Sequence, residues 1–378
     1  MGSIACTDGL DGHGESAKED HIIVIGAGII GVSIAYHLAR RGAQVTVLDK
    51  QTPGSECTQG AFAMLIASHT DGTEELNRLY GLAVAEWRQL EAHLGESLPI
   101  QWGGVVNWVE PGHKVEEMVS TRKLLREWNV MVDALSEDDI KFLVPGAIPG
   151  PVGAGNFLPG YGSLDVKQAF TTLVQEAEKL GVVFRTPVQV TNLTCGEIGI
   201  PRLSTNEGSI EADKIVIAAG AGSSQLAHSL GVRVPLNIVS GTLAYSEPMP
   251  PVLHRVLNGP KGSIRQNPDG RIVTGLDYRP GADGHDVSDA YGEMLLKNAA
   301  EVVPALVGME LDEMTLGHVP IPEDSSPILG FCDSSKTIYV ATTMSGVTMA
   351  PLVGRLAAAE VLGEHATILD PFRPSRFN

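Results

Sequence analysis

Three glycines and one aspartate near the N-terminus have the types and spacing that could bind a phosphate-rich ligand. Gly26, Gly28 and Gly31 form the pattern G-x-G-x-x-G, and Asp49 follows eighteen residues after the last glycine. The first glycine of such a pattern permits a tight turn, the second leaves room for a pyrophosphate, and the third lets a helix lie close to a strand. An aspartate at this distance can accept hydrogen bonds from ribose hydroxyls. The four residues predict a dinucleotide site.

The residues around this pattern have the periodicity of a strand, a helix and a second strand. Residues 22–25 are apolar, Ile30, Ile34 and Leu38 recur at four-residue steps, and residues 45–48 are again apolar. This context distinguishes a dinucleotide-binding motif from a chance glycine-rich turn. The N-terminus of the helix would offer free N–H groups and partial positive charge to the phosphates.

The composition is that of a folded enzyme that carries excess negative charge. The chain has 378 residues, of which 43% are hydrophobic and 19% charged, and this suits two lobes or one large interrupted domain. A formal net charge of −18 argues against nucleic acid or an anionic membrane as a partner. The four cysteines have no zinc or disulfide spacing, and no window approaches the ~18 apolar residues of a membrane span. We expect a cytoplasmic protein without a metal site, and a disordered leader over residues 1–20.

A further buried strand, at residues 214–218, ends in the glycine-rich stretch AAGAGSS. It resumes the strand–helix–strand pattern more than a hundred residues after the first unit. Further helices lie between the two units, and after the second unit come strands at residues 234–246, 263–266 and 271–275, with Asp269-Gly270 as a hairpin turn. We therefore expect the nucleotide-binding domain to be interrupted by another domain.

Four motifs together resemble the D-amino-acid oxidase-like family of FAD-dependent amine and amino-acid oxidoreductases, which includes glycine oxidases and sarcosine oxidases. They are the glycine pattern with Asp49, IVIAAGAGS at residues 215–223, PEDSSPILG at 322–330, and SGVTMAPLVGRLAAAEVLG at 345–363 followed by PFRPSRF. The likeness runs from about His21 to Phe377. It implies FAD as the cofactor and an α/β, two-lobed fold, in which a Rossmann-type FAD-binding domain is interrupted by a substrate domain with an antiparallel sheet. The implied FAD-binding domain comprises residues 21–95, 150–233 and 315–378, and the implied substrate domain comprises 96–149 and 234–314.

The resemblance also implies which residues contact the cofactor. At the ADP half these are Gly26, Gly28, Ile29, Ile30, Gly31, Asp49, Lys50, the backbone of Val188, Ala219 and Gly220. Near the phosphates and the flavin they are Ser55, Thr58, Gln59 and Gly60. At the pyrimidine end of the isoalloxazine they are Met344, Ser345, Gly346, Val347 and Thr348.

Two departures from the family pattern concern the substrate. Relatives that act on simple amino acids have a G-x-R-P-like sequence whose arginine grips the substrate carboxylate, and here the sequence is Gly317-His318-Val319-Pro320. With valine at this position, the chain lacks the cation that would hold a substrate carboxylate by two hydrogen bonds. Gly317 also stands near the position of the covalent flavin cysteine in some relatives, which excludes attachment there. Met344 replaces a histidine found in many relatives.

Several residues remain as candidates for chemistry. Arg265 is the best remaining cation, although a structural ion pair is as plausible, and His318 could orient or deprotonate an amine, although a lone histidine is more often structural. Met344, Val319, Tyr245 and His69 are the candidates for the substrate pocket. Cys57 could be a covalent link or a redox thiol, and a small buried hydrophobic residue is the favoured interpretation.

The function predicted from these observations is oxidation of a C–N bond in an amine or modified amino acid, with a secondary or cyclic amine in a larger metabolite favoured. Hydride would pass to flavin N5, and oxygen would accept the electrons to give hydrogen peroxide. Two alternatives stay open. One is a dehydrogenase of the same fold with another acceptor, and the other is a flavin-binding protein without redox turnover or an isomerase.

Overall fold

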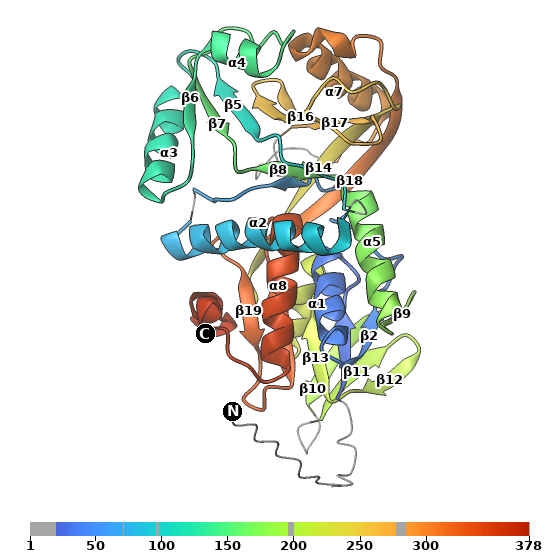
Figure 1. Cartoon of the computed structure of the whole chain (residues 1–378). Coiled ribbons are helices and arrows are strands. Elements are labelled where there is room, and N and C mark those ends of the chain that lie inside the picture. Colours follow the sequence, from blue (N-terminus) through green and yellow to red (C-terminus); the bar gives the residue numbers. More distant parts are fainter. Residues whose placement is uncertain (1–19, 71, 96–97, 196–199, 277–284, 378) are drawn as a thin grey trace, which may run out of the picture.

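The computed structural model of the protein describes residues 20–70, 72–95, 98–195, 200–276 and 285–377. The expected leader, apart from residue 20, lies outside these ranges. Figure 1 shows two lobes, with the N-terminal strand in the lower lobe and a long helix crossing between the lobes.

The lower lobe is built on a six-stranded sheet. Its strands, in spatial order, are β19 (Ile328–Phe331), β20 (Ile338–Thr342), β13 (Lys214–Ile217), β1 (His21–Ile25), β2 (Gln44–Leu48) and β9 (Val183–Arg185). All neighbours are parallel except β19, which is antiparallel to β20. The central strand β1 reads HIIVI and is buried on both sides, as parallel strands covered by helices require.

Two helices pack closely on one face of this sheet. They are α1 (Ile29–Ala39) and α8 (Gly346–Val361). The Ser33 hydroxyl donates to the Ala350 carbonyl at 2.8 Å, and a Cβ on Gly354 would lie 2.2 Å from the Ser33 Oγ. Small residues at the contact therefore allow the two helix backbones to approach. Each helix follows the carboxyl end of a parallel strand, β1 or β20, so the N-termini of both helices open at the same edge of the sheet.

The upper lobe is built on an eight-stranded, largely antiparallel sheet. Its strands, in spatial order, are β18 (Leu311–Pro322), β14 (Leu236–Ser246), β17 (Ile272–Gly275), β16 (Gly262–Gln266), β15 (Val256–Gly259), β5 (Val105–Val109), β7 (Ala154–Leu158) and β6 (Asp133–Leu135). Only the β15–β5 pair is parallel. The helix α7 (Asp289–Val302) covers the face that carries Ala244 and Met314, and the opposite face, with Leu243 and Tyr245, packs toward the lower lobe.

The remaining elements connect the two sheets. The smaller strands are β3 (Met64–Leu65), β8 (Gly162–Leu164) and β4 (Ile100–Gln101) in one sheet, and β10 (Val190–Cys195), β11 (Pro201–Thr205) and β12 (Gly208–Glu211) in another. The other helices are α2 (Glu74–Leu94), α3 (Val115–Glu127), α4 (Glu137–Leu143), α5 (Val166–Lys179) and α6 (Ser223–His228), with 3-10 turns at Gly220–Gly222, Pro304–Leu306, Thr367–Phe372 and Pro374–Phe377. Residue Thr73 caps α2, because its hydroxyl accepts from the Leu76 N–H.

Strand pairing refines the domain boundaries expected from the sequence. A boundary at residue 150 would assign β7 to the FAD-binding domain, but β7 pairs with β5 and β6 of the upper sheet. A boundary at residue 315 would divide β18, which pairs with β14 along its whole length. We propose boundaries after β7 and at the end of β18, so that each sheet stays within one domain.

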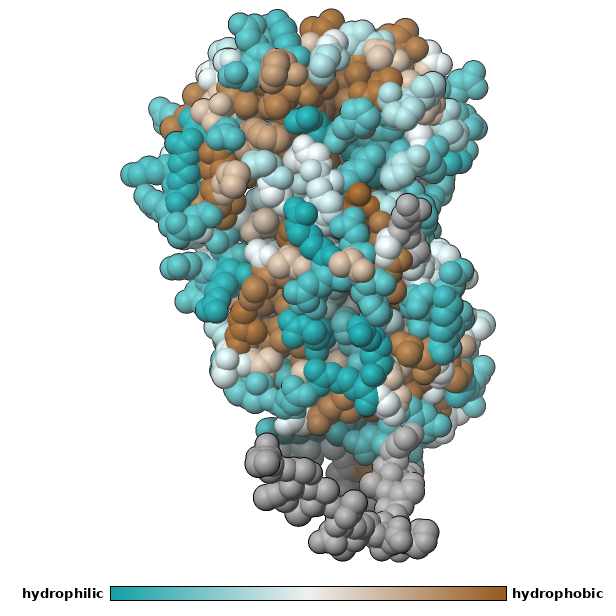
Figure 2. Space-filling view, in the orientation of Figure 1, coloured by the Kyte–Doolittle hydropathy of each residue, from teal (hydrophilic) through white to brown (hydrophobic). Residues whose placement is uncertain are grey.

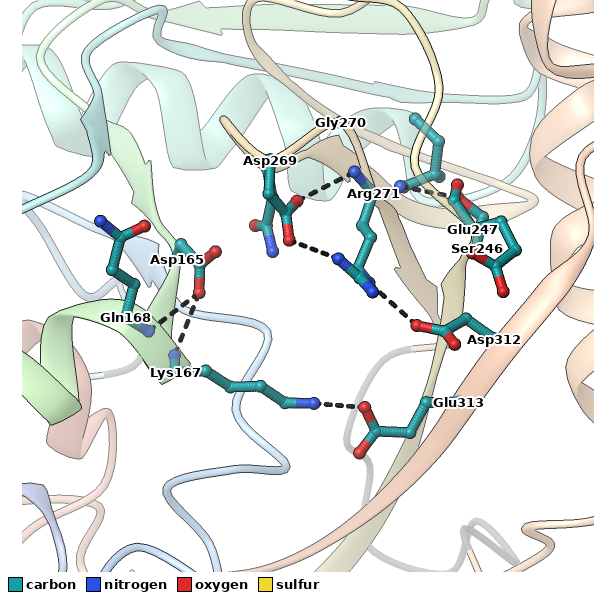
Figure 3. A network of polar contacts seen from close by, with 12 residues as sticks. Asp165, Lys167, Gln168, Ser246, Glu247, Asp269, Gly270, Arg271, Asp312 and Glu313 are labelled. Carbon is teal, nitrogen blue, oxygen red and sulfur yellow. Dashed lines mark hydrogen bonds and ion pairs between the residues drawn. The ribbon is translucent and has the colours of Figure 1, made fainter.

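Polar contacts join the lobes near the base of β18. Figure 3 shows Lys167, at the start of α5, reaching Glu313 of β18, while Arg271 lies between Asp269 and Asp312. The Lys167 ammonium also lies 4.7 Å from the centre of the Tyr245 ring. These pairs are partly exposed, so each contributes about 0–1 kcal/mol. Of these contacts, those of Lys167 cross between the lobes, whereas Asp269, Arg271 and Asp312 all belong to the upper lobe.

The face of the molecule seen in Figure 2 is mixed, with hydrophilic residues over most of it. Hydrophobic residues come to the surface chiefly on the upper lobe. Within the part of the chain that the structure describes, no helix combines the length and apolar character needed to cross a membrane.

Candidate active site

A cavity of about 600 Å³ lies where the two lobes meet. Its floor is formed by the carboxyl ends of the parallel strands β1, β2 and β13 and by the N-termini of α1 and α8. Its upper wall comes from β14, β17 and β18. Ligands of open α/β sheets bind at this edge, outside the carboxyl ends of the strands.

The three glycines of the motif have three different surroundings. Gly26 has φ +107°, and a Cβ there would lie 2.3 Å from the Ala218 carbonyl oxygen. A Cβ on Gly31 would lie 1.9 Å from the Gly26 oxygen, so this glycine permits the contact between α1 and the turn. At Gly28 the nearest atom would be the Thr58 Oγ1 at 3.6 Å, an ordinary contact. Protein packing therefore requires the first and third glycines, whereas the second leaves space for a ligand.

Asp49 borders the cavity and also fixes the turn beside it. One carboxylate oxygen accepts the Ala27 N–H at 2.7 Å, and the other accepts the Gln51 N–H at 2.9 Å. Each oxygen retains a second lone pair that can accept a ribose hydroxyl. Beside it, Lys50 pairs with Glu56 at 3.2 Å in a partly exposed position.

The loop after β2 also reaches the cavity. The Thr58 hydroxyl accepts the Ile29 N–H at 3.0 Å, and Ser55 donates to Gln51 at 3.0 Å. Gln59 donates to the Ser55 carbonyl and does not border the cavity. Gly60 does not border it either, because a Cβ there would lie 2.5 Å from the Gly317 backbone, where the lobes touch.

Most of the expected cofactor contacts come together around this one cavity. Gly31, Gln59 and Gly60 are the exceptions, and each supports a neighbouring segment instead. The residues that border it are Gly26, Gly28, Ile29, Ile30, Asp49, Lys50, Ser55, Thr58, Val188, Ala219, Gly220, Met344, Ser345, Gly346, Val347 and Thr348. The Val188 N–H donates to the Asp49 carbonyl at 2.7 Å, so its own carbonyl is the backbone group that an adenine could meet.

The loop before α8 directs a helix N-terminus into the cavity. Ser345 has φ +54°, and the first helical bond runs from the Met349 N–H to the Ser345 carbonyl. The preceding N–H groups, those of Gly346, Val347 and Thr348, have no acceptor within the helix, and all three residues border the cavity. They can donate to a ligand and stabilise negative charge on it.

Two helix N-termini, those of α1 and α8, thus face one elongated space. This arrangement suits a ligand with a pyrophosphate near α1 and, farther along, a ring near α8 that becomes negative on reduction. The glycine gap, the Asp49 carboxylate and the free N–H groups of α8 together fit FAD. Bound FAD would supply the hydride-accepting ring.

The upper wall is the inner face of the eight-stranded sheet. Gly317 marks this face, because a Cβ on it would lie 3.2 Å from the Gly60 backbone. Successive side chains of a strand point to opposite faces, so Val319 points the same way as Gly317. Val319 pairs with Val239, and Gly317 pairs with Gly241, in an uninterrupted register.

The same alternation places the His318 side chain on the outer face, although His318 borders the cavity. Its Nδ1 lies 2.9 Å from the hydroxyl of Ser240, its cross-strand neighbour, and its ring lies 6.3 Å from that of the exposed His285. This geometry argues against the expected catalytic role of the His318 imidazole.

Arg265 points to the inner face but does not border the cavity. It is 1% exposed, its Nε donates to the Phe62 carbonyl at 2.6 Å, and a second nitrogen donates to Asn267. Tyr245 is buried beside it, also away from the cavity, and burial raises its pKa. The expected substrate contacts of Arg265 and Tyr245 are therefore not supported, because neither residue borders the cavity, whereas Phe62, which contacts the Arg265 guanidinium, does.

His69 and Met344 do border the cavity, from the lower lobe. The His69 ring stacks on Tyr80 with centroids 5.3 Å apart, and the Tyr80 hydroxyl bonds to the Ser345 side chain. Burial raises the pKa of Tyr80, so its hydroxyl stays protonated. Tyr80 was not predicted from the sequence, because it is one residue in the apolar stripe of α2 and only the tertiary contact distinguishes it.

Cys57 borders the cavity near the phosphate end. Burial raises the pKa of its thiol to about 12. The thiol therefore stays protonated at neutral pH, and the chemistry of a thiolate nucleophile is not supported.

Comparison with known proteins defines the class of this protein. A family model described as FAD dependent oxidoreductase matches residues 21–360. The chain belongs to this family, FAD is its cofactor, and it is an oxidoreductase. The predicted family, fold class and cofactor are confirmed.

Individual relatives span most of the chain. Glycine oxidase of Bacillus licheniformis is 28% identical over 360 residues, which cover 92% of this chain and 94% of the relative. The 4-methylaminobutanoate oxidase of Paenarthrobacter nicotinovorans is 25% identical over 90% of this chain, which corresponds to only 43% of that longer protein. The crystal structure of glycine oxidase from Geobacillus kaustophilus superposes with a TM-score of 0.86 at 24% identity, covering 94% of this chain and 99% of the other.

Proposed function

We propose that this enzyme oxidises the C–N bond of a secondary or cyclic amine, or of a modified amino acid within a larger metabolite. Hydride would pass from the substrate carbon to the bound FAD, and the resulting imine would be hydrolysed by water. Oxygen would accept the electrons and give hydrogen peroxide. A cytoplasmic location is part of the same proposal.

The observation that carries the substrate class is the apolar upper wall. Val319 stands on the inner face of β18, where the family pattern has an arginine, and Leu243 and Leu276 also border the cavity. Among the described residues that border the cavity, Lys50 is the only lysine or arginine, and it lies next to Asp49 at the nucleotide end. A free carboxylate beside the reacting amine would therefore be buried without a bidentate partner, which is unfavourable.

The names of relatives support an alkylated amine. The 4-methylaminobutanoate oxidase of Paenarthrobacter nicotinovorans is named for an N-methylated amine. Dimethylglycine dehydrogenase of Rattus norvegicus, 25% identical over 94% of this chain and 44% of its own length, is also named for one.

The chain's own contribution to this chemistry would be orientation and desolvation. An apolar wall disfavours a charged ammonium and so lowers the pKa of a bound amine. The neutral amine is the form that can give up hydride, so a site of this kind needs no strong general base. The N–H groups at the start of α8 would stabilise the negative charge of reduced flavin, and Met344 and Val319 would exclude water.

The test is the visible spectrum of the FAD-loaded protein under anaerobic conditions. N-methylated and cyclic secondary amines should bleach the flavin band near ~450 nm, whereas glycine and other free amino acids should not. Air should then restore the band and release hydrogen peroxide.

Other results would decide against parts of the proposal. Rapid bleaching by free amino acids would refute the substrate class. Bleaching that air reverses only slowly, with fast reoxidation by a quinone or dye, would identify a dehydrogenase. If the protein binds FAD but no amine bleaches the flavin band, the result would favour a non-redox role or an isomerase.

A further inference from the structure

The helix that faces the flavin site carries a proline in its second turn. Pro351 lies within α8 and has no N–H. In an uninterrupted α-helix, the residue at this position would donate to the carbonyl four residues earlier, which is that of Val347. Val347 also borders the cavity, and its own N–H is among those without an acceptor in the helix. The proline therefore removes a backbone hydrogen bond from the turn that must hold the ligand.

A side chain from another helix supplies the missing donor. The Trp87 Nε1 donates to the Val347 carbonyl at 2.9 Å and to the Thr348 carbonyl at 3.1 Å. Trp87 is fully buried in α2, and its indole carries only this one N–H donor. The indole N–H thus gives the Val347 carbonyl the hydrogen bond that an amide at position 351 would have given. Without it, a buried carbonyl would lack its partner, which is unfavourable.

Other contacts fix the same turn. Tyr80 lies seven residues before Trp87, two turns along the same face of α2, and bonds to Ser345. The Thr348 hydroxyl donates to the Met64 carbonyl of β3 at 3.1 Å. The start of α8 is therefore held from α2 on one side and from β3 on the other.

We propose that Trp87 is a positioning residue, which replaces the amide absent at Pro351 and so aims the N–H groups of Gly346 to Thr348 at the pyrimidine end of the flavin. This inference rests on the proposed contact between α8 and reduced flavin. If the first turn of α8 were looser, these N–H groups would be less well aligned with the flavin. They would then stabilise the negative charge of reduced FAD less strongly.

The experiment is a double-mutant cycle with the replacements Trp87→Phe and Pro351→Ala. The phenylalanine keeps the ring and loses the donor, while the alanine gives α8 an amide that can bond to the Val347 carbonyl. We expect Trp87→Phe to raise the FAD dissociation constant about tenfold and to lower the flavin midpoint potential. The double variant should recover most of both losses.

A second tryptophan provides a matched control. The Trp108 indole is 2% exposed and donates to the Pro149 carbonyl at 3.0 Å, in the upper lobe and away from the cavity. Trp108→Phe should lower the thermal unfolding temperature while leaving the FAD dissociation constant and the potential unchanged.

Two results would overturn the inference. The first is that Trp87→Phe keeps the midpoint potential and the FAD dissociation constant of the wild type. The second is that the double variant has the same potential and dissociation constant as Trp87→Phe. If the potential changes as expected but no amine bleaches the flavin, the inference stands and the proposed function fails. Thermal unfolding of the four apoproteins shows independently whether the two substitutions are coupled, and an absence of coupling would refute the replacement of the amide by the indole.

Discussion

Replacing Gly28 with alanine should weaken FAD binding without unfolding the apoprotein. Gly28 has φ −77° and ψ 174°, which alanine adopts readily, and the nearest atom to its Cβ would be the Thr58 Oγ1 at 3.6 Å. The added methyl reduces the conformational entropy of the unfolded chain, which stabilises the folded protein by about 0.4–1 kcal/mol. Alanine is a poorer N-cap than glycine, which destabilises it by a comparable amount. The stability of the apoprotein should therefore change by less than about 1 kcal/mol.

The bound cofactor should respond differently. The methyl would stand where the pyrophosphate must approach the N-terminus of α1, and forcing an extra methyl into a packed contact costs about 1–3 kcal/mol. This corresponds to a rise of about 5- to 150-fold in the FAD dissociation constant. Titration of the apoprotein with FAD, followed by the quenching of flavin fluorescence, measures this constant.

Gly31→Ala is the matched control with the opposite expectation. A Cβ there would lie 1.9 Å from the Gly26 oxygen, far below the 3.0 Å that real Cβ atoms keep, so α1 must move away from the turn. This variant should lose stability even without FAD, which thermal unfolding of the apoprotein would show. The reasoning is refuted if Gly28→Ala binds FAD as the wild type does, or if its apoprotein unfolds as early as that of Gly31→Ala.

Three further predictions follow from single side chains. Asp49→Ala should destabilise the turn and raise the FAD dissociation constant about tenfold or more, because two N–H groups lose a charged acceptor; an unchanged constant in the same titration would contradict this. Val319→Arg should let free amino acids bleach the flavin, because it places a cation on the inner face, and stopped-flow reduction by glycine would measure the gain; no gain would show that β18 does not face the substrate. Burial lowers the pKa of His37 from 6.5 to about 3, so only the unfolded chain takes up this proton between those values. Stability should therefore fall as pH drops from 6.5 toward 3, and denaturant unfolding of His37→Leu should show a smaller fall.

Contiguous patterns predicted much of the fold. The β1–α1–β2 unit could be predicted because its hydrophobic periodicity, its glycines and Asp49 all lie within thirty residues. The resemblance to the family then marked residues 344–348 as cofactor contacts, and the structure shows that α8 begins within this segment, at Gly346. The strand β18 was not predicted, because Gly317 and two prolines, Pro320 and Pro322, interrupt its pattern. Only its pairing with β14 shows that this segment is a strand.

The candidate catalytic residues were harder to predict, because each depends on which face of a strand it occupies. A shift of one residue moves a side chain to the other face of a sheet. The sequence placed His318 and Val319 side by side, and only the pairing with Ser240 and Val239 shows that the valine faces inward. Arg265 lies on the correct face, yet its guanidinium is bound to the Phe62 carbonyl, a contact between residues two hundred positions apart.

By itself, the sequence determined that this protein binds a dinucleotide, because a phosphate site made from a turn and a helix N-terminus needs only local residues. The tertiary structure decided which side chains surround the reacting end of that ligand. Those side chains come from strands and helices distant in the chain, so their identity depends on register and packing. The bond from Trp87 to the turn that precedes Pro351 is of this kind: the sequence contains both residues, and only the packing of α2 on α8 brings the donor to the carbonyl that lacks one.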